Sequence, residues 1–206
     1  LVVRPISIVQ LVWAKFLGAL VVVLLAVLPT LVYLWSVHVL GSPVGNLDWG
    51  AAIGSFIGLI ALGAAYTAVA VFASSLTTNN VVAFVLGVAF NMGLYLGFEA
   101  LADLYKFSGW ELTVRNFGIN EHYRSMSRGV IDARDLGYFI CLVLLFIGAT
   151  VAVIGRPHLK APWRKAFVYM VGAVALLVLT FTVRFRFDLT EEQRFSLSEG
   201  TASLLE

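Results

Sequence analysis

The sequence predicts an all-α, polytopic transmembrane protein, and three observations predict it. Hydrophobic residues make up 60% of the 206 residues, charged residues only 13%, and the mean hydropathy is +0.92. The apolar residues are gathered into runs, several of them long enough to cross a bilayer, with short polar segments between them. The net charge of +2 is small and dispersed, so nucleic acid is not an expected partner.

The segment Gly155–Lys165 orients the prediction. It carries Arg156, Lys160, Arg164 and Lys165 and no acid. Short loops rich in Lys and Arg stay on the cytoplasmic side of a membrane. We therefore expect this loop inside, the N-terminus cytoplasmic and the C-terminus extracytoplasmic.

The first expected span, Phe16–Leu40, follows a mixed segment, Leu1–Lys15. Pro29 should kink this span, because proline removes a backbone donor from a helix. A turn-rich outer loop, Gly41–Trp49, follows it. We then expect a second span, Ala51–Ala73, that returns inward.

Three glycines recur at every fourth position at the start of the second span. Gly50, Gly54 and Gly58 therefore share one helix face, which permits close approach of another helix. The simple interpretation is helix packing, and the functional one is a face that moves during transport. An uncharged inner turn, Ser74–Asn80, ends this hairpin.

The third expected span is Val81–Phe98, with Glu99 at its outer end. Asn91 is its one strongly polar side chain, and we expect it to bond to a neighbouring helix rather than line a pathway. The longest loop, Leu101–Asp135, balances its charges, which suits the outside. Its second half predicts a short helix in the interface plane, broken at Gly129.

A fourth span, Leu136–Ile154, leads to the basic loop, and a fifth, Ala166–Val183, leads out again. Thr190 with Gln193, and Ser198, are candidate helix caps in the tail. We expect both ends of the sequence to be truncations, with further spans before Leu1 and an extracytoplasmic domain of which the tail is only the start.

The P-loop and the commonest hydrolase signatures do not occur in the sequence. It contains no Walker A motif, no G-x-S-x-G and no H-E-x-x-H. His38, His122 and His158 fall on different expected sides, and Cys141 is a single cysteine inside an apolar run. No expected span has an acid or base near its middle, where one costs about 2.5–3.5 kcal/mol. An ion-coupled carrier and an intramembrane enzyme are therefore disfavoured.

Three stretches resemble permeases of the ABC-2 transporter family, and in particular its gliding-motility type. They are RPISIVQLVWAKFLGAL, the segment WGAAIGSFIGLIALGAAYTAVAVFASSLTTNNVVAF, and HYRSMSRGVIDARDLGYF. The resemblance covers residues 1–154. Residues 155–206, with FDLTEEQRFSLSEGTASLLE, resemble the opening of the auxiliary subunit that accompanies these permeases.

The resemblance implies a six-span permease that dimerises with a second copy and docks cytoplasmic ABC ATPase subunits. ATP and Mg²⁺ would bind to those partners, and this chain would bind no cofactor or metal and catalyse nothing. The implied ATPase-coupling face comprises Arg4, Pro5, Ser74, Ser75, Thr77 and Asn79. The outer-loop motif comprises His122, Arg124, Ser127, Arg128, Asp132 and Asp135.

For Arg128, Asp132 and Asp135 we expect ion pairs that seat the outer loop over the spans, rather than contacts with a substrate. The leading hypothesis is a transporter subunit in a bacterial inner membrane, joined to the anchor of an extracytoplasmic auxiliary domain. The alternative is a scaffold that transmits ATP-driven change to that domain without moving a solute.

Overall fold

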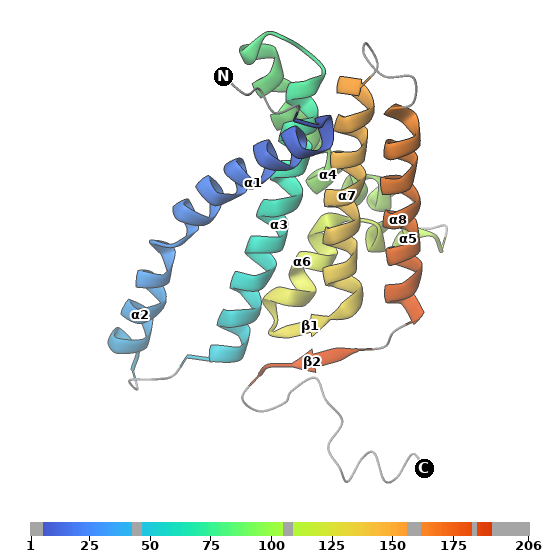
Figure 1. The fold of residues 1–206 in the computed structure, drawn as a ribbon. Coiled ribbons are helices and arrows are strands. Elements are labelled where there is room, and N and C mark those ends of the chain that lie inside the picture. The colour runs from blue at the N-terminus through green and yellow to red at the C-terminus, as the bar shows by residue number, and fades with distance from the viewer. Residues whose placement is uncertain (1–5, 43–46, 105–108, 156–161, 183–184, 191–206) are drawn as a thin grey trace.

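The computed structural model describes residues 6–42, 47–104, 109–155, 162–182 and 185–190. They form eight helices and two short strands (Figure 1). The long helices are α1 (Ile8–Val27), α3 (Trp49–Ser75), α4 (Asn80–Leu104), α7 (Ala133–Gly155) and α8 (Pro162–Thr182). The short elements are α2 (Thr30–Leu40), α5 (Glu111–Asn116), α6 (Ile119–Ser127), β1 (Val130–Asp132) and β2 (Arg186–Asp188).

Four helical segments of the described residues are long and apolar enough to cross a membrane. They are Ile8–Leu40, which combines α1 and α2, and the helices α3, α4 and α7. The apolar stretch of α8, Phe167–Thr180, is shorter. The predicted all-α fold is confirmed, with four helices that could serve as membrane spans. The fifth span remains a prediction, and two basic residues of the basic loop, Arg156 and Lys160, lie outside the described residues.

The first helix begins at Ile8, eight residues earlier than predicted. The overlooked signal is a capping box, in which the hydroxyl of Ser7 accepts from the backbone of Gln10 and the Gln10 side chain accepts from the backbone of Ser7. The predicted kink at Pro29 is confirmed, because α1 ends at Val27 and α2 begins at Thr30. The hydroxyl of Thr30 donates to the carbonyl of Val27 at 2.6 Å, which satisfies one of the freed acceptors.

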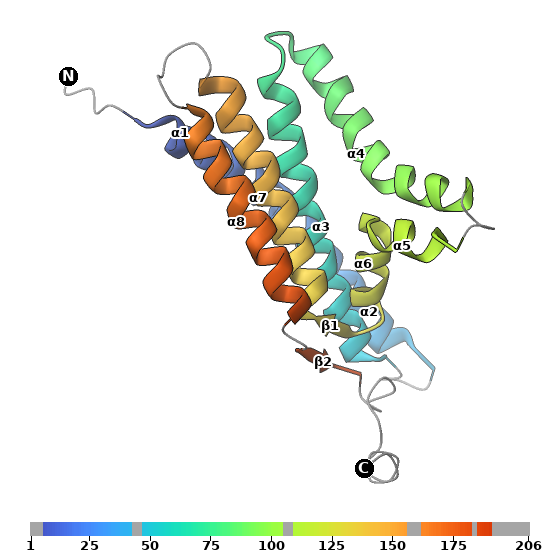
Figure 2. The ribbon, with the colours of Figure 1, turned by 90° about the vertical axis from the view of Figure 1, so that its right-hand side faces the viewer.

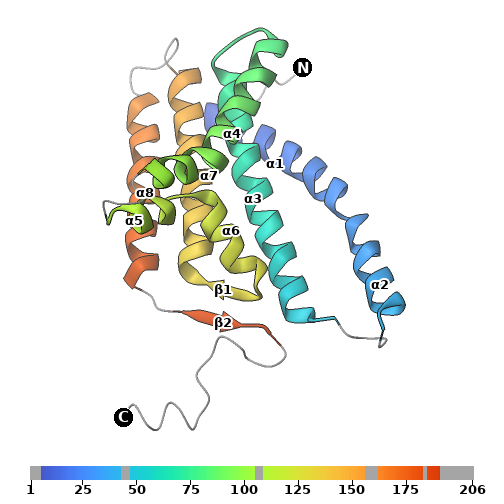
Figure 3. The same ribbon diagram turned by 180° about the vertical axis from the view of Figure 1, so that it is seen from behind.

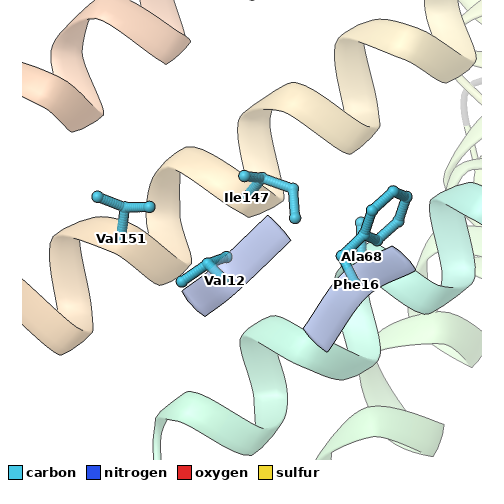
Figure 4. Packing of buried hydrophobic residues seen from close by; sticks show 5 residues of the cluster. All are labelled: Val12, Phe16, Ala68, Ile147 and Val151. Carbon is cyan, nitrogen blue, oxygen red and sulfur yellow. The ribbon is translucent and has the colours of Figure 1, made fainter. Parts of the chain in front are cut away.

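Helices α3, α7 and α8 lie side by side, and α1 crosses them near one end (Figure 1). There α1 packs on α3 and α7 through a cluster of buried apolar side chains (Figure 4). The cluster comprises Val12, Phe16, Ala68, Ile147 and Val151. We call this end, which holds the turn between α3 and α4, the turn end. The opposite end, which holds β1 and β2, is the sheet end.

Helix α4 starts beside α3 at the turn end and then diverges from it (Figure 2). The chain returns through α5, which lies level with the middle of α7 and α8 in all three views, and α6 then descends along α3 to the sheet end (Figure 3). The predicted end of the third span at Phe98 is wrong, because α4 continues through Glu99 to Leu104. Helices α5 and α6, which were predicted to belong to an outer loop, instead lie along α4 and α3.

A short helix is present in the second half of that loop as α6, and it ends before Gly129, whose φ of +85° suits only glycine well. It was expected in the interface plane, but it lies along α3 (Figure 3). Helix α6 buries Ile119 and Met126 against α3 and α7. Strands β1 and β2 pair antiparallel, with Ile131 opposite Phe187. This two-stranded sheet was not predicted from the sequence.

Candidate functional site

The three predicted glycines form one buried face on the sheet-end half of α3. Helix α3 can begin here because the carboxylate of Asp48 caps it, accepting from the backbone of Ala51 at 3.0 Å. The predicted close approach at this face is confirmed. A β-carbon at Gly54 would lie 2.5 Å from the carbonyl oxygen of Met126, and one at Gly58 would lie 3.2 Å from the side chains of Met126 and Tyr123.

A second segment, the residues that follow β2, packs against Gly50. A β-carbon at Gly50 would overlap the backbone carbonyl of Leu189. The amide of Leu189 also donates to the carbonyl of Gly129 at 2.9 Å, and Gly129 itself lies against Gly50 and Ala51 of α3. We call the face formed by Gly50, Gly54 and Gly58 the glycine seat. It holds the end of α6 and the segment after β2 against α3.

A polar pair holds α6 to the start of α7. Nδ1 of His122 lies 2.7 Å from Oδ1 of Asp135, and Nε2 lies 3.0 Å from the backbone oxygen of Asn116. Both ring nitrogens therefore lie within hydrogen-bond distance of an acceptor oxygen, one on α7 and one at the end of α5. The ring also stacks on Tyr138, with centroids 4.0 Å apart, and the Tyr138 hydroxyl donates to the carbonyl of Phe117 at 2.8 Å. These contacts fix the orientation of α6 on α7.

The expected ion pairs are only partly found. Asp135 has one, and its partner is His122. The carboxylate of Asp132 instead accepts from the backbone of Arg134 at 2.9 Å, a local contact at the start of α7. Arg128 caps the end of α6 with its backbone, and no salt bridge to it occurs among the described residues. Spacing alone did not identify the partner because His122 lies one helix away from Asp135.

Two further motif residues contribute through backbone carbonyls, and Ser127 also through its hydroxyl. The hydroxyl of Ser127 donates to the carbonyl of Arg124 at 2.9 Å, within α6. The Ser127 carbonyl accepts from the hydroxyl of Ser55, at 3.1 Å, one residue beyond Gly54 on α3. The outer-loop motif is thus a structural junction, where α3, α6, β1 and α7 meet.

At the turn end, the predicted coupling residues are engaged locally. The hydroxyls of Ser74 and Ser75 donate to carbonyls of their own helix, at 2.8 and 2.6 Å. The side-chain oxygen of Asn79 accepts from the backbone N–H of Val81 at 2.9 Å and caps α4. The backbone N–H of Asn79 donates to the Thr77 hydroxyl at 3.2 Å. Arg4 and Pro5 lie outside the described residues. The two serines line an open cavity of about 220 Å³, which is also lined by Val12, Lys15, Val71, Thr150 and Ile154.

A polar cluster between α4 and the α5–α6 segment was not predicted. The amide of Asn120 donates to Glu99 at 3.2 Å. The guanidinium of Arg115 lies 2.9 Å from Glu111 and 3.6 Å from Asp103. These residues are distributed over three helices, so only the return of the chain along α4 brings them together. The residues that form this cluster, called here the mid-depth cluster, are Glu99, Asp103, Glu111, Arg115, Asn120 and Glu121.

Two other predictions concern single residues. The amide of Asn91 on α4 lies 3.4 Å from the carbonyl of Tyr66 on α3, which confirms the expected bond to a neighbouring helix. Cys141 is free and buried in α7. Among the described residues, no group of three or more His, Cys, Asp or Glu could hold a metal ion. The tail caps Gln193 and Ser198 lie outside the described residues, and Thr190 bonds to Asp188 instead.

Comparisons of the chain with protein-family profiles, with curated proteins and with solved structures find no match.

Proposed function

We propose that the chain is the membrane subunit of an ATP-driven transporter of the ABC-2 type, of the gliding-motility kind. Residues 1–154 supply the permease, and residues 155–206 supply the anchor of an extracytoplasmic auxiliary domain. The chain resides in a bacterial inner membrane, with the turn end in the cytoplasm and the sheet end outside. It is not an enzyme, because ATP and Mg²⁺ bind to a separate ATPase, and it pairs with a second permease copy.

One observation supports this proposal above the others. Strand β2, from the auxiliary-like part, pairs with β1, and the segment after β2 rests on the glycine seat of the permease-like part. A β-carbon at Gly137 of α7 would also overlap the side chain of Thr180 on α8. At Gly50 on α3 and at Gly137 on α7, the two parts of the chain therefore pack too closely to admit a methyl group. Such close packing is typical of segments that move together.

Helix α3 could transmit movement from the turn end to the sheet end. It is about 40 Å long at 1.5 Å per residue, which exceeds the roughly 30 Å of hydrocarbon. Its turn-end half is fixed to α1 and α7 by the cluster that contains Ala68 (Figure 4). Its sheet-end half carries the glycine seat. A shift imposed on α1 by an ATPase at the turn end would therefore reach the segment after β2 through one rigid helix.

A second function, a scaffold that moves no solute, is favoured by the same contact. Leu189 touches α3 through backbone atoms and not through a flexible side chain. Movement of α3 would therefore be passed directly to any domain that follows residue 190. In this function ATP hydrolysis displaces an extracytoplasmic domain, and the membrane helices transmit the movement to it.

Affinity purification of the full chain from its native membrane tests the shared part of both functions. We expect an ATPase with a Walker A motif to co-purify and its ATP turnover to change on reconstitution with the chain. An intact, monodisperse chain that brings down no ATPase would contradict both. Reconstituted vesicles then separate them, since ATP-dependent movement of solute supports transport, and ATP turnover without it supports the scaffold.

A further inference from the structure

The mid-depth cluster lies near the middle of the bundle, as contacts to α3 show. Ile119, the first residue of α6, is buried in one cluster with Ala65. Ala65 lies 16 residues after Trp49, which is about 24 Å along a helix about 40 Å long. Asn120 follows Ile119 directly and bonds to Glu99. Glu99 and its neighbours are therefore far from both ends of α3.

The ionised side chains of this cluster are not enclosed by the described residues. The Asp103 side chain is 58% exposed, and those of Arg115 and Glu111 are 31% and 27% exposed. Ionised groups at this depth are rarely in contact with lipid, because hydrocarbon solvates them poorly. In membrane proteins they face a protein interior or a water-filled cavity.

The backbone gives a second, independent reason. Helix α4 ends at Leu104 and α5 begins at Glu111, level with the middle of α7 and α8 (Figure 2). The ends of both helices leave backbone donors and acceptors without helical partners. At membrane depth such backbone is tolerated where it is buried in protein or lines water, and not where it meets lipid.

We propose that the face formed by α4, α5 and the start of α6 lines a water-filled vestibule that reaches the middle of the membrane from the sheet end. A small cavity already lies within this face, with a volume of about 10 Å³, room for about one water molecule. It is lined by Tyr95, Glu99, Arg115, Gly118, Asn120 and Glu121. The inference deepens the transport part of the proposed function, because it gives a hydrophilic cargo a place to pass.

The charges of the cluster indicate the kind of cargo. Four acids, Glu99, Asp103, Glu111 and Glu121, face one base, Arg115, so these side chains carry a formal charge of −3. Such a surface attracts cations and repels anions, because charge lining a recess focuses its field. Neutral or cationic hydrophilic solutes are therefore the class that the vestibule would accept.

Cysteine accessibility tests this inference in the full chain. With Cys141→Ser as the background, the reporters are Asp103→Cys in the cluster and Leu112→Cys on α5, where Leu112 is 71% exposed. The control is Val22→Cys on α1. Val22 is 65% exposed, and its neighbour Val23 touches Gly63 of α3, so the control lies at a similar depth.

Proteoliposomes are treated with charged, membrane-impermeant thiol reagents from either side, and a permeant maleimide shows that each thiol is free. We expect both reporters to react from one side only. Val22→Cys should react roughly a hundredfold more slowly or not at all, since burying one charge at mid-membrane carries a penalty of that order. At Leu112→Cys, a cationic reagent should be favoured over an anionic one more strongly than at a free thiol.

The vestibule is contradicted if both reporters resist the impermeant reagents as strongly as Val22→Cys does while the permeant maleimide labels them. It is also contradicted if all three positions react equally. Cross-linking of the two reporters between copies, without labelling by the impermeant reagents, would overturn it in favour of a second copy covering this face. Because none of these readouts involves an ATPase, a failed co-purification would leave the vestibule intact, and the two failures are distinguishable.

Discussion

Gly50 on α3 lies in direct backbone contact with Leu189, and a β-carbon at Gly50 would overlap the Leu189 carbonyl. The contact joins the first residues of α3 to the segment after β2, which are far apart in the sequence. It also explains why the first position of the predicted glycine face cannot be replaced by alanine without moving the chain.

We predict that Gly50→Ala destabilises the protein by roughly 1–3 kcal/mol, the usual cost of overpacking a fitted contact. The methyl group must displace Leu189, so the segment after β2 should also become sensitive to protease. Thermal unfolding in detergent and limited proteolysis measure the two effects. Gly18→Ala is the matched control, because Gly18 lies in α1 with open space around it. It should be neutral or stabilising by about 0.5–1 kcal/mol. Equal melting temperatures and equal protease sensitivity of the two variants would show that Gly50 is not packed against Leu189.

Gly129→Ala should be more harmful than Gly109→Ala. Both glycines have positive φ, +85° and +74°, so alanine strains both by roughly 1–2 kcal/mol. Only Gly129 is also enclosed, since a β-carbon there would lie 3.0 Å from backbone atoms of Gly50 and Ala51 and from Thr190. The difference between the two melting temperatures therefore reports the enclosure alone. No difference would mean that the turn after α6 does not rest on α3.

Removal of His122 should destabilise the junction of α6 and α7. The Asp135 side chain is only 9% exposed, and its Oδ2 atom has no hydrogen-bond partner among the described residues. His122→Ala leaves the carboxylate without its nearest donor, at a cost of roughly 1–3 kcal/mol. A double-mutant cycle with Asp135→Ala should give a coupling energy of about 0.5–3 kcal/mol. Strict additivity would show that the pair contributes nothing to the junction of α6 and α7.

Asn91→Leu should leave stability nearly unchanged, within about 1 kcal/mol. The present bond to the Tyr66 carbonyl is long, at 3.4 Å, and the Oδ1 atom of Asn91 is buried without a partner among the described residues. Replacement of an under-satisfied polar group by an apolar one of similar size is often neutral or favourable. Reconstituted transport should also persist. A large loss of transport with normal stability would favour the pathway interpretation of Asn91.

Local patterns in the sequence predicted much of the bundle. The apolar runs, the break at Pro29 and the shared face of Gly50, Gly54 and Gly58 each depend on residues close together in the chain. The recurrence of glycine at every fourth residue was enough to predict close packing. It did not predict which segments pack there, namely the end of α6 and the segment after β2.

The remaining features depend on contacts between distant residues. Strands β1 and β2 have three residues each, too few for an alternating pattern, and they form because α7 and α8 bring them together. The depth of the α5–α6 segment follows from the divergence of α4, which no local signal encodes. For the same reason Glu99, although visible in the sequence, was assigned to a surface.

Co-purification from the native membrane tests the central claim most directly. The full chain, solubilised and purified as a monodisperse species, should bring with it an ATPase that carries a Walker A motif. The turnover of that ATPase should change when the chain is reconstituted with it. Recovery of the intact chain with no ATPase bound, and no response of the chain to ATP and Mg²⁺, would contradict the claim.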